Sequence, residues 1–144
     1  MIVTSPGNSL LRRTVKTLTF TGGAGLGAVG AVPLMTVTGA VNVSLITGFV
    51  TTDLTVAAGA TLALGVTGST SKFIAATDAS TLLTTAPIWL STTATAAALA
   101  IPAACKDIMI AANIIGTVGV DAISAGVMVF VVYWLPLTND GNLV

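Results

Sequence analysis

An alternation of polar and apolar residues runs from Thr36 to Leu45 and limits what this chain can fold into. Val37, Val41 and Val43 share one parity with Leu45, while threonine, asparagine and serine take most positions between them. Because successive side chains of a β-strand point to opposite faces, this period of two predicts a half-buried strand. A membrane-spanning helix of the same length needs no such alternation.

The polar composition predicts the same class of structure along the whole chain. Of the 144 residues, 54% are hydrophobic and only 7% are charged, with no histidine, and threonine dominates the remaining polar letters. Threonine is β-branched and fits a pleated strand better than a helix. The length is that of one domain, so we predict a single all-β body.

Further short apolar runs, bounded by Gly, Ser, Asp and Pro, extend this prediction into a jelly-roll-like β-sandwich. The expected strands lie near residues 35–50, 61–67, 73–77, 88–90, 108–115 and 127–135. Turns are expected at residues 52–53, 68–71 and 121–126, and Asp78 is expected to cap a loop or a helical turn. Residues 92–104 predict either a strand or an irregular loop.

The N-terminal segment differs from the rest in charge. It holds three of the five basic residues and no acidic one, so we predict an extended arm and Gly-rich connector over 1–34, followed by the sandwich over 35–144. Two interpretations of the arm stay open: a frayed terminus with solvated charges, or a contact for a partner. The candidate partner-binding residues are Leu10, Leu11, Arg12, Arg13 and Lys16.

The sequence GLGAVG at residues 25–30 matches the G-x-G-x-x-G pattern of dinucleotide-binding proteins, and Asp53 follows at a suitable distance. That fingerprint requires a helix directly after the glycines. Here Pro33 and the alternation from Thr36 leave no room for one. We therefore expect tightly turning backbone that joins the arm to the β body, and no nucleotide site.

Mean hydropathy is +1.00, and residues 31–50 and 108–135 are long and apolar enough to raise the question of a membrane span. The alternation divides the first stretch, and glycines with Asp121 divide the second. Each piece is then strand-length, so we expect no association with a membrane.

The sparse charge predicts that much of the surface is covered by other subunits or by a larger assembly. Ten charges over the roughly 6,800 Å² expected for this mass are few for a solitary protein. The net charge is zero, which disfavours nucleic-acid binding.

The sequence offers few residues of the types that carry out catalysis. There is no His and no Glu, the five Asp residues are far apart, and Cys105 is the single cysteine, so we expect no enzyme, no cofactor and no metal site. Cys105 is expected to be a small buried hydrophobe. The larger aromatic residues are assigned to the core or to a trimer interface; they are Trp89, Tyr133 and Trp134.

Several short motifs together resemble the head decoration (cement) proteins of tailed bacteriophages. They are VTG at 37–39, FIA at 73–75, TDAS at 77–80, IW at 88–89, IIGTVG at 114–119, ISAG at 123–126, YWLPL at 133–137 and DGN at 140–142. The resemblance covers residues 35–142 and is carried by short apolar pieces.

The resemblance implies a jelly-roll sandwich and a homotrimer bound to the major capsid protein on the outer surface of the capsid. It also implies that the N-terminal arm contacts the capsid protein, a part that Arg12, Arg13 and Lys16 would play. The Gly and Ala content of residues 22–31 departs from what the family leads us to expect. The alternative function is a trimeric head or tail fibre module that binds a host surface receptor.

Overall fold

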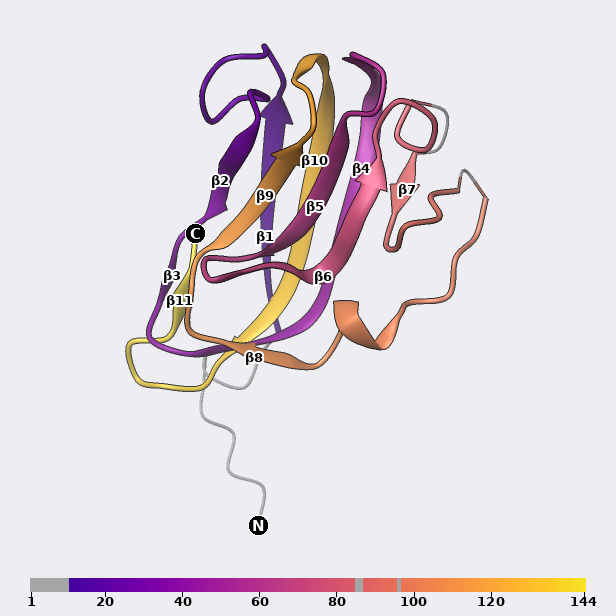
Figure 1. The fold of residues 1–144 in the computed structure, drawn as a ribbon. Helices are drawn as coiled ribbons and strands as arrows, with labels where there is room; N and C mark the ends of the chain where they lie inside the picture. Colours follow the sequence, from indigo (N-terminus) through magenta and orange to yellow (C-terminus); the bar gives the residue numbers. More distant parts are fainter. Residues whose placement is uncertain (1–10, 85–86, 96) are drawn as a thin grey trace.

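The fold is all-β, as the composition predicts. The computed structural model describes residues 11–84, 87–95 and 97–144, which contain eleven β-strands, the short 3₁₀ helix η1 (Ala103–Cys105) and no α-helix (Figure 1). In these residues no helix has the length and apolar character to cross a membrane.

The first sheet is built around the longest strands of the chain. Its order is β1-β10-β4-β7, β8 also pairs with β4, and all neighbours are antiparallel. The strands are β1 (Arg12–Thr19), β4 (Val41–Val56), β7 (Ile88–Trp89), β8 (Ile108–Ile110) and β10 (Ile123–Pro136). Strand β10 lies between β1 and β4, so both partners depend on it.

The second sheet has the order β2-β9-β5-β6, and a small separate pair joins β11 to β3. The strands are β2 (Gly30–Met35), β3 (Val37–Thr38), β5 (Thr61–Val66), β6 (Ser69–Asp78), β9 (Ile114–Gly119) and β11 (Asn142–Leu143). Figure 1 shows this sheet lying in front of the sheet of β1, β10 and β4.

One hydrophobic core fills the space between the sheets. The cluster includes Phe130 and Ile46 from the first sheet and Leu62, Leu64 and Ile114 from the second, and all five are almost completely buried. Burying apolar area of this kind is the main stabilising term of a fold, at roughly 25 cal/mol per Å².

A β-bulge in β4 changes which residues face this core. Trp134 pairs with Val43 and Tyr133 pairs with Leu45, so Ser44 is the extra residue. An extra residue reverses the alternation, because the side-chain period is two. Val43 is therefore buried before the bulge, while after it Ile46 is buried and Leu45 only partly so. The prediction that Leu45 shares a face with Val43 is wrong for this reason.

The predicted boundary at residue 34 is also wrong. Arg12–Thr19 is a strand that pairs with β10 along its whole length, and Gly30–Met35 pairs with β9, so both belong to the body of the fold. An extended arm is thus absent from residues 12–34. Leu10 and the other residues of 1–10 lie outside the described residues.

Three local predictions need correction. Thr52 and Asp53 lie inside β4 instead of at a turn, and residues 123–126 lie inside β10, so the expected loop is confined to residues 120–122. The strand expected over 108–115 is split into β8 and β9. The strands expected near 61–67, 73–77 and 88–90 are confirmed. The described part of 92–104 is irregular apart from the bridge of Thr95 to Ile88 and the start of η1.

Candidate functional site

The basic residues of the predicted arm lie on β1, an edge strand. Strand alternation places Arg12, Thr14 and Lys16 on the inner side of the sheet and Arg13 and Val15 on the outer side. The Arg12 guanidinium lies 5.1 Å from the centre of the Trp134 ring, a cation–π contact that fixes its position. Arg13 is exposed to solvent. Leu11, directly before the strand, is also exposed.

A hydrogen-bond relay joins β1 to β10 and to the last described strand. The indole N–H of Trp134 donates to the Thr14 hydroxyl at 3.0 Å, and that hydroxyl donates to the carbonyl oxygen of Leu143 at 3.0 Å. Each polar atom of the relay therefore has a partner, and Thr14 connects three segments that are distant in the sequence.

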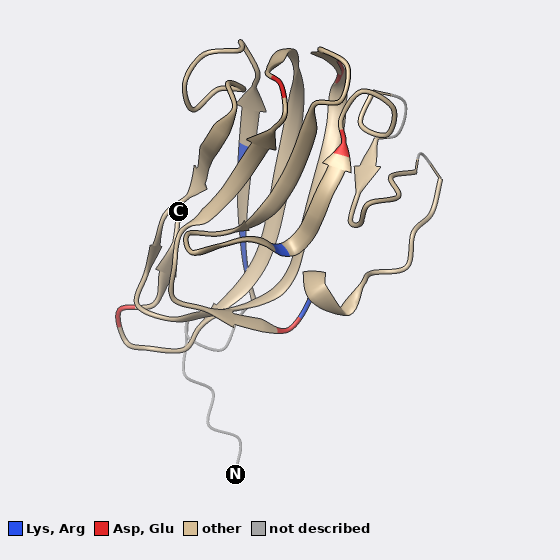
Figure 2. Ribbon diagram, viewed as in Figure 1, with Lys and Arg blue, Asp and Glu red and all other residues tan. Residues whose placement is uncertain are grey.

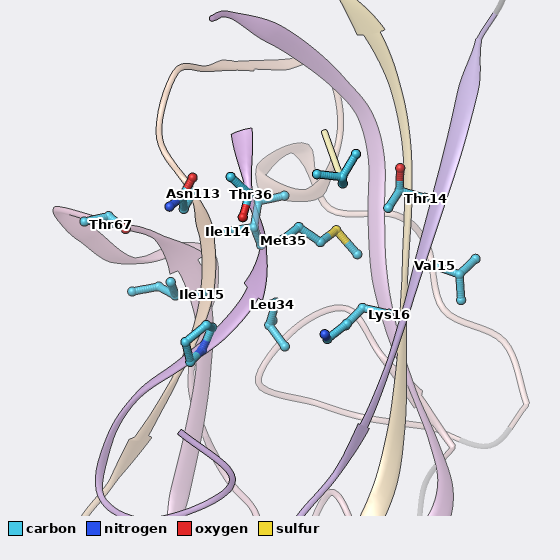
Figure 3. A pocket seen from close by; sticks show the side chains of 12 residues that line it. Thr14, Val15, Lys16, Leu34, Met35, Thr36, Thr67, Asn113, Ile114 and Ile115 are labelled. Atoms are coloured by element: carbon cyan, nitrogen blue, oxygen red, sulfur yellow. The ribbon is translucent and has the colours of Figure 1, made fainter. Parts of the chain in front are cut away.

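Beside this relay a groove of about 430 Å³ opens between the two sheets. Leu34, Met35 and Ile115 provide apolar walls, and Asn113 lies at its rim. Figure 3 shows the Lys16 side chain reaching toward Leu34 in the groove, whereas Val15 points away from it. The structure records no ion pair for Lys16 with any residue that it describes. A cationic group thus faces an open groove that has both apolar walls and polar side chains.

The opposite side of the molecule holds a second relay. The indole N–H of Trp89 donates to the Thr77 hydroxyl at 2.9 Å, and that hydroxyl donates to the Ala75 carbonyl oxygen at 3.0 Å. Trp89 belongs to the first sheet and Thr77 to the second, so this bond joins the sheets. The Trp89 ring also makes an edge-on contact with Phe130, with ring centres 6.4 Å apart.

The predicted core or interface aromatics therefore divide into two groups. Trp89 and Trp134 are buried within the single chain and belong to the core, whereas Tyr133 is half-buried. Tyr133 follows the outward parity of β10, opposite to the buried Trp134. Of the three side chains, that of Tyr133 is the one that reaches the surface of this chain.

Cys105 is fully buried beside the Trp89 relay, as predicted. Its Sγ lies 3.2 Å from the Leu90 carbonyl oxygen and 3.5 Å from that of Phe73, and the thiol is the donor. Burial raises the pKa of Cys105 from 9.0 to about 11. The thiol is therefore protonated at neutral pH and holds η1 against strand β6.

The G-x-G-x-x-G stretch forms a compact loop between β1 and β2. The N–H of Ile123 donates to the Gly27 carbonyl oxygen at 2.8 Å, which attaches the loop to the start of β10. Gly27 has a φ of 122°, and a Cβ there would collide with the Ile123 carbonyl oxygen. A strand, and no helix, follows at Gly30. The glycines therefore serve a tight turn and a close approach, which confirms the predicted tightly turning backbone, although the loop joins β1 to β2 and does not join an arm to the body.

The acidic residues stay apart in space. Asp78 caps a turn, since its Oδ1 accepts bonds from the Ser80 hydroxyl and N–H at 2.6 and 2.8 Å, and these bonds hold the pKa of its carboxyl below the ordinary 3.8. Asp121 accepts a bond from the N–H of Ala122 at 2.7 Å. Within the described ranges, His, Cys, Asp and Glu do not gather in any group of three or more that could hold a metal ion.

The β9–β10 connection carries an exposed valine in an uncommon conformation. The N–H of Asp121 donates to the Gly119 carbonyl oxygen at 2.8 Å, and Val120 between them has a φ of 67°. A β-branched residue in the left-handed region is strained. Its side chain is 77% exposed, so the strained turn presents an apolar group to the outside.

Comparison with family models, with curated proteins and with solved structures finds no match for this chain. The groove, its lysine and the strained turn are therefore interpreted from their own geometry. Sequence reasoning missed the groove because its lining comes from segments far apart in the chain: Lys16 on β1, Leu34 on β2 and Asn113 directly before β9. The β-branched content of RTVKTLT, residues 13–19, with three threonines and Val15, was a signal for β1.

Proposed function

We propose that this chain is a structural virion protein that decorates and stabilises the outside of a bacteriophage capsid. In this proposal it has a jelly-roll-like topology, forms a homotrimer and binds the major capsid protein. The described features support it in three ways: the all-β body, a surface with few charges, and basic residues gathered on one exposed edge strand.

The observation that carries the proposal is the presence of exposed apolar side chains at both ends of the body. The ten charges of the chain are spread over a surface of 6900 Å² (Figure 2). At one end Leu26, Val29 and Val120 are exposed on the β1–β2 and β9–β10 connections, and at the other Met109 and Leu137 are exposed (Figure 1). Exposed apolar surface at two opposite ends suits a protein that has neighbours on both sides.

Binding of this kind stabilises a lattice without chemistry. A protein that binds only the assembled, expanded lattice favours that state by mass action. A trimer that contacts several capsid subunits at once adds avidity, because each further contact is intramolecular. The affinity reflects only the part of the burial free energy that exceeds the free-energy cost of association.

The first test is the mass of the purified chain by light scattering during gel filtration. We expect a single species near three times 14.2 kDa. Purified heads of the phage that encodes the chain are then mixed with it before and after expansion. Binding to expanded heads alone is expected, and a label found only on the tail would favour the fibre alternative. A monomer that leaves both head forms bare contradicts the proposal.

A charge test addresses the β1 residues. Replacing both Arg13 and Lys16 with Ser is expected to weaken head binding and to flatten its dependence on salt, because screened ion pairs are lost. The matched control replaces Lys72 and Lys106 with Ser, which removes the same charge elsewhere on the surface. Equal occupancy and equal salt dependence in the two variants would show that β1 makes no charged contact with the head.

A further inference from the structure

The outer edge of β1 presents backbone groups that no described strand pairs with. The N–H of Phe20 donates to the Gly126 carbonyl oxygen at 2.9 Å, in register with the β1–β10 ladder. Antiparallel strands repeat such bonds at every second residue, so the even-numbered residues of β1 bond to β10. The N–H and C=O groups of Arg13, Val15 and Thr17 therefore point away from β10, along the free edge.

Two other edges of the sheets, at β7 and β2, are protected. The outer edge of β7 is closed by Thr95, which exchanges two backbone bonds of 3.0 and 3.1 Å with Ile88. Strand β2 carries Pro33, which lacks an N–H and is typical of edges that do not accept another strand. Strand β1 has no proline, and Val15 at its centre is exposed. Its edge is therefore an open template for strand addition.

The charges beside this edge select the chemistry of an incoming strand. Arg13 lies on its outer face and Lys16 on its inner face, next to the groove walls Leu34 and Met35. All five aspartates lie outside β1, and the structure records no ion pair for Arg13 or Lys16 with any residue that it describes. A second copy of β1 would add cations to cations, which disfavours self-pairing.

We propose that the β1 edge binds an extended segment of a partner protein by strand addition, with an acidic side chain of that segment opposite Lys16 and an apolar side chain over the groove. Main-chain bonds to β1 supply affinity, and the groove with its lysine supplies selectivity. The inference rests on the proposed function only for the identity of the protein that provides the segment.

The test uses the full, isotopically labelled chain and three synthetic peptides as long as β1, eight residues. The peptides alternate valine with threonine and carry Asp, Asn or Lys at the position placed opposite Lys16. In NMR titrations we expect the Asp peptide to bind about tenfold more tightly than the Lys peptide. Amide exchange is expected to slow at Arg13, Val15 and Thr17 and to stay unchanged at Thr14 and Lys16.

Two variants examine the edge itself. Val15→Pro removes an outward N–H and leaves every bond to β10 in place, so we expect a folded chain that binds the Asp peptide at least about tenfold more weakly. Val15→Thr keeps the N–H and is the matched control, expected to bind like the parent. Thr17→Pro repeats the test at the next outward residue. Lys16→Gln is expected to bind the Asp and Asn peptides with equal affinity.

Each outcome decides the proposal. Undiminished peptide binding by folded Val15→Pro or Thr17→Pro, or no binding of any acidic peptide, overturns it. A dimer of the parent chain that Val15→Pro abolishes would show that a second copy occupies the edge, which also overturns it. Peptide binding with the expected pattern but no binding to phage heads would contradict the proposed function and leave the strand addition standing.

Discussion

Two tryptophans donate to two threonines on opposite sides of this molecule, and the sides differ in how they are closed. On one side the Trp89–Thr77 bond joins the two sheets in a dry interior. On the other side the Trp134–Thr14 bond joins β10 to β1 within one sheet, next to an open groove. The same Trp–Thr hydrogen bond thus joins the two sheets at one edge, whereas at the other it joins only two strands of one sheet.

The difference shows two ways of managing a sheet edge. The closed side is covered by a long segment, of which the described parts of residues 79–107 lie across the edge. Thr95 bonds to β7, and the Cys105 thiol contacts the Leu90 and Phe73 carbonyl oxygens. The open side uses charge, since Arg13 and Lys16 flank an edge that remains unpaired in the described structure. Edge strands without cover invite pairing, and charges restrict which strands can pair. Changes on the closed side should therefore affect stability, and changes on the open side should affect binding.

The largest effect is expected from Trp89→Ala. The change removes a fully buried ring and the hydrogen bond from its indole N–H to Thr77, so it should cost about 3–5 kcal/mol of unfolding free energy. Denaturant unfolding measures it. Tyr133→Ala, at a half-buried position on the outer face, is the control and should cost clearly less. Equal losses would remove the distinction between core and surface aromatics.

An alkaline loss of stability is expected from Cys105. Burial raises its folded pKa from 9.0 to about 11, so the unfolded chain releases the thiol proton at lower pH than the folded chain does. The resulting stabilisation is complete below pH 9.0 and declines as the pH rises toward about 11, by up to about 2.7 kcal/mol. Unfolding free energies across this window measure the decline. In Cys105→Ala the decline should be smaller by that amount, and an identical profile would contradict burial of the thiol.

The smallest effect compares the two threonines directly. Thr77→Val leaves the Trp89 N–H without a partner in a dry interior, which should cost about 1–3 kcal/mol. Thr14→Val makes the same change beside the groove, where water can replace the hydroxyl, so the cost should stay below about 1 kcal/mol. Parallel denaturation of the two variants measures the difference. A larger loss from Thr14→Val would mean that the open side is the more rigid one.

Much of the strand content could be predicted because it depends on local pattern. Leu62 and Leu64 alternate with smaller residues, and Val127–Leu135 is a long β-branched run, so each predicts a strand without knowledge of its partner. The tight Gly-rich loop also follows from local information, since Pro33 and the next strand exclude a helix.

The pairing of strands, and which side chains of a strand face the core, could not be predicted in the same way. The cluster of Arg12, Arg13 and Lys16 resembled a solvated arm because the partner strand that organises it lies at the other end of the chain. The bulge at Ser44 reverses the inward face of β4, and no letter of the sequence marks it. Thr52 and Asp53 resembled a turn because residues 51–53 of β4 are polar and all exposed. The groove could not be predicted either, because its walls come from three segments that are far apart in the sequence.

The position of β10 in the sheet has a consequence for the order of events during synthesis. Thr14 and Trp134, which bond to each other, are 120 positions apart in the chain. Both β1 and β4 pair with β10, which is synthesised after every other strand of that sheet. Contacts this distant close slowly, and unpaired apolar strands are exposed to aggregation until they do. We therefore expect this sheet to form late and nearly all at once, with a newly made chain most vulnerable just before β10 emerges.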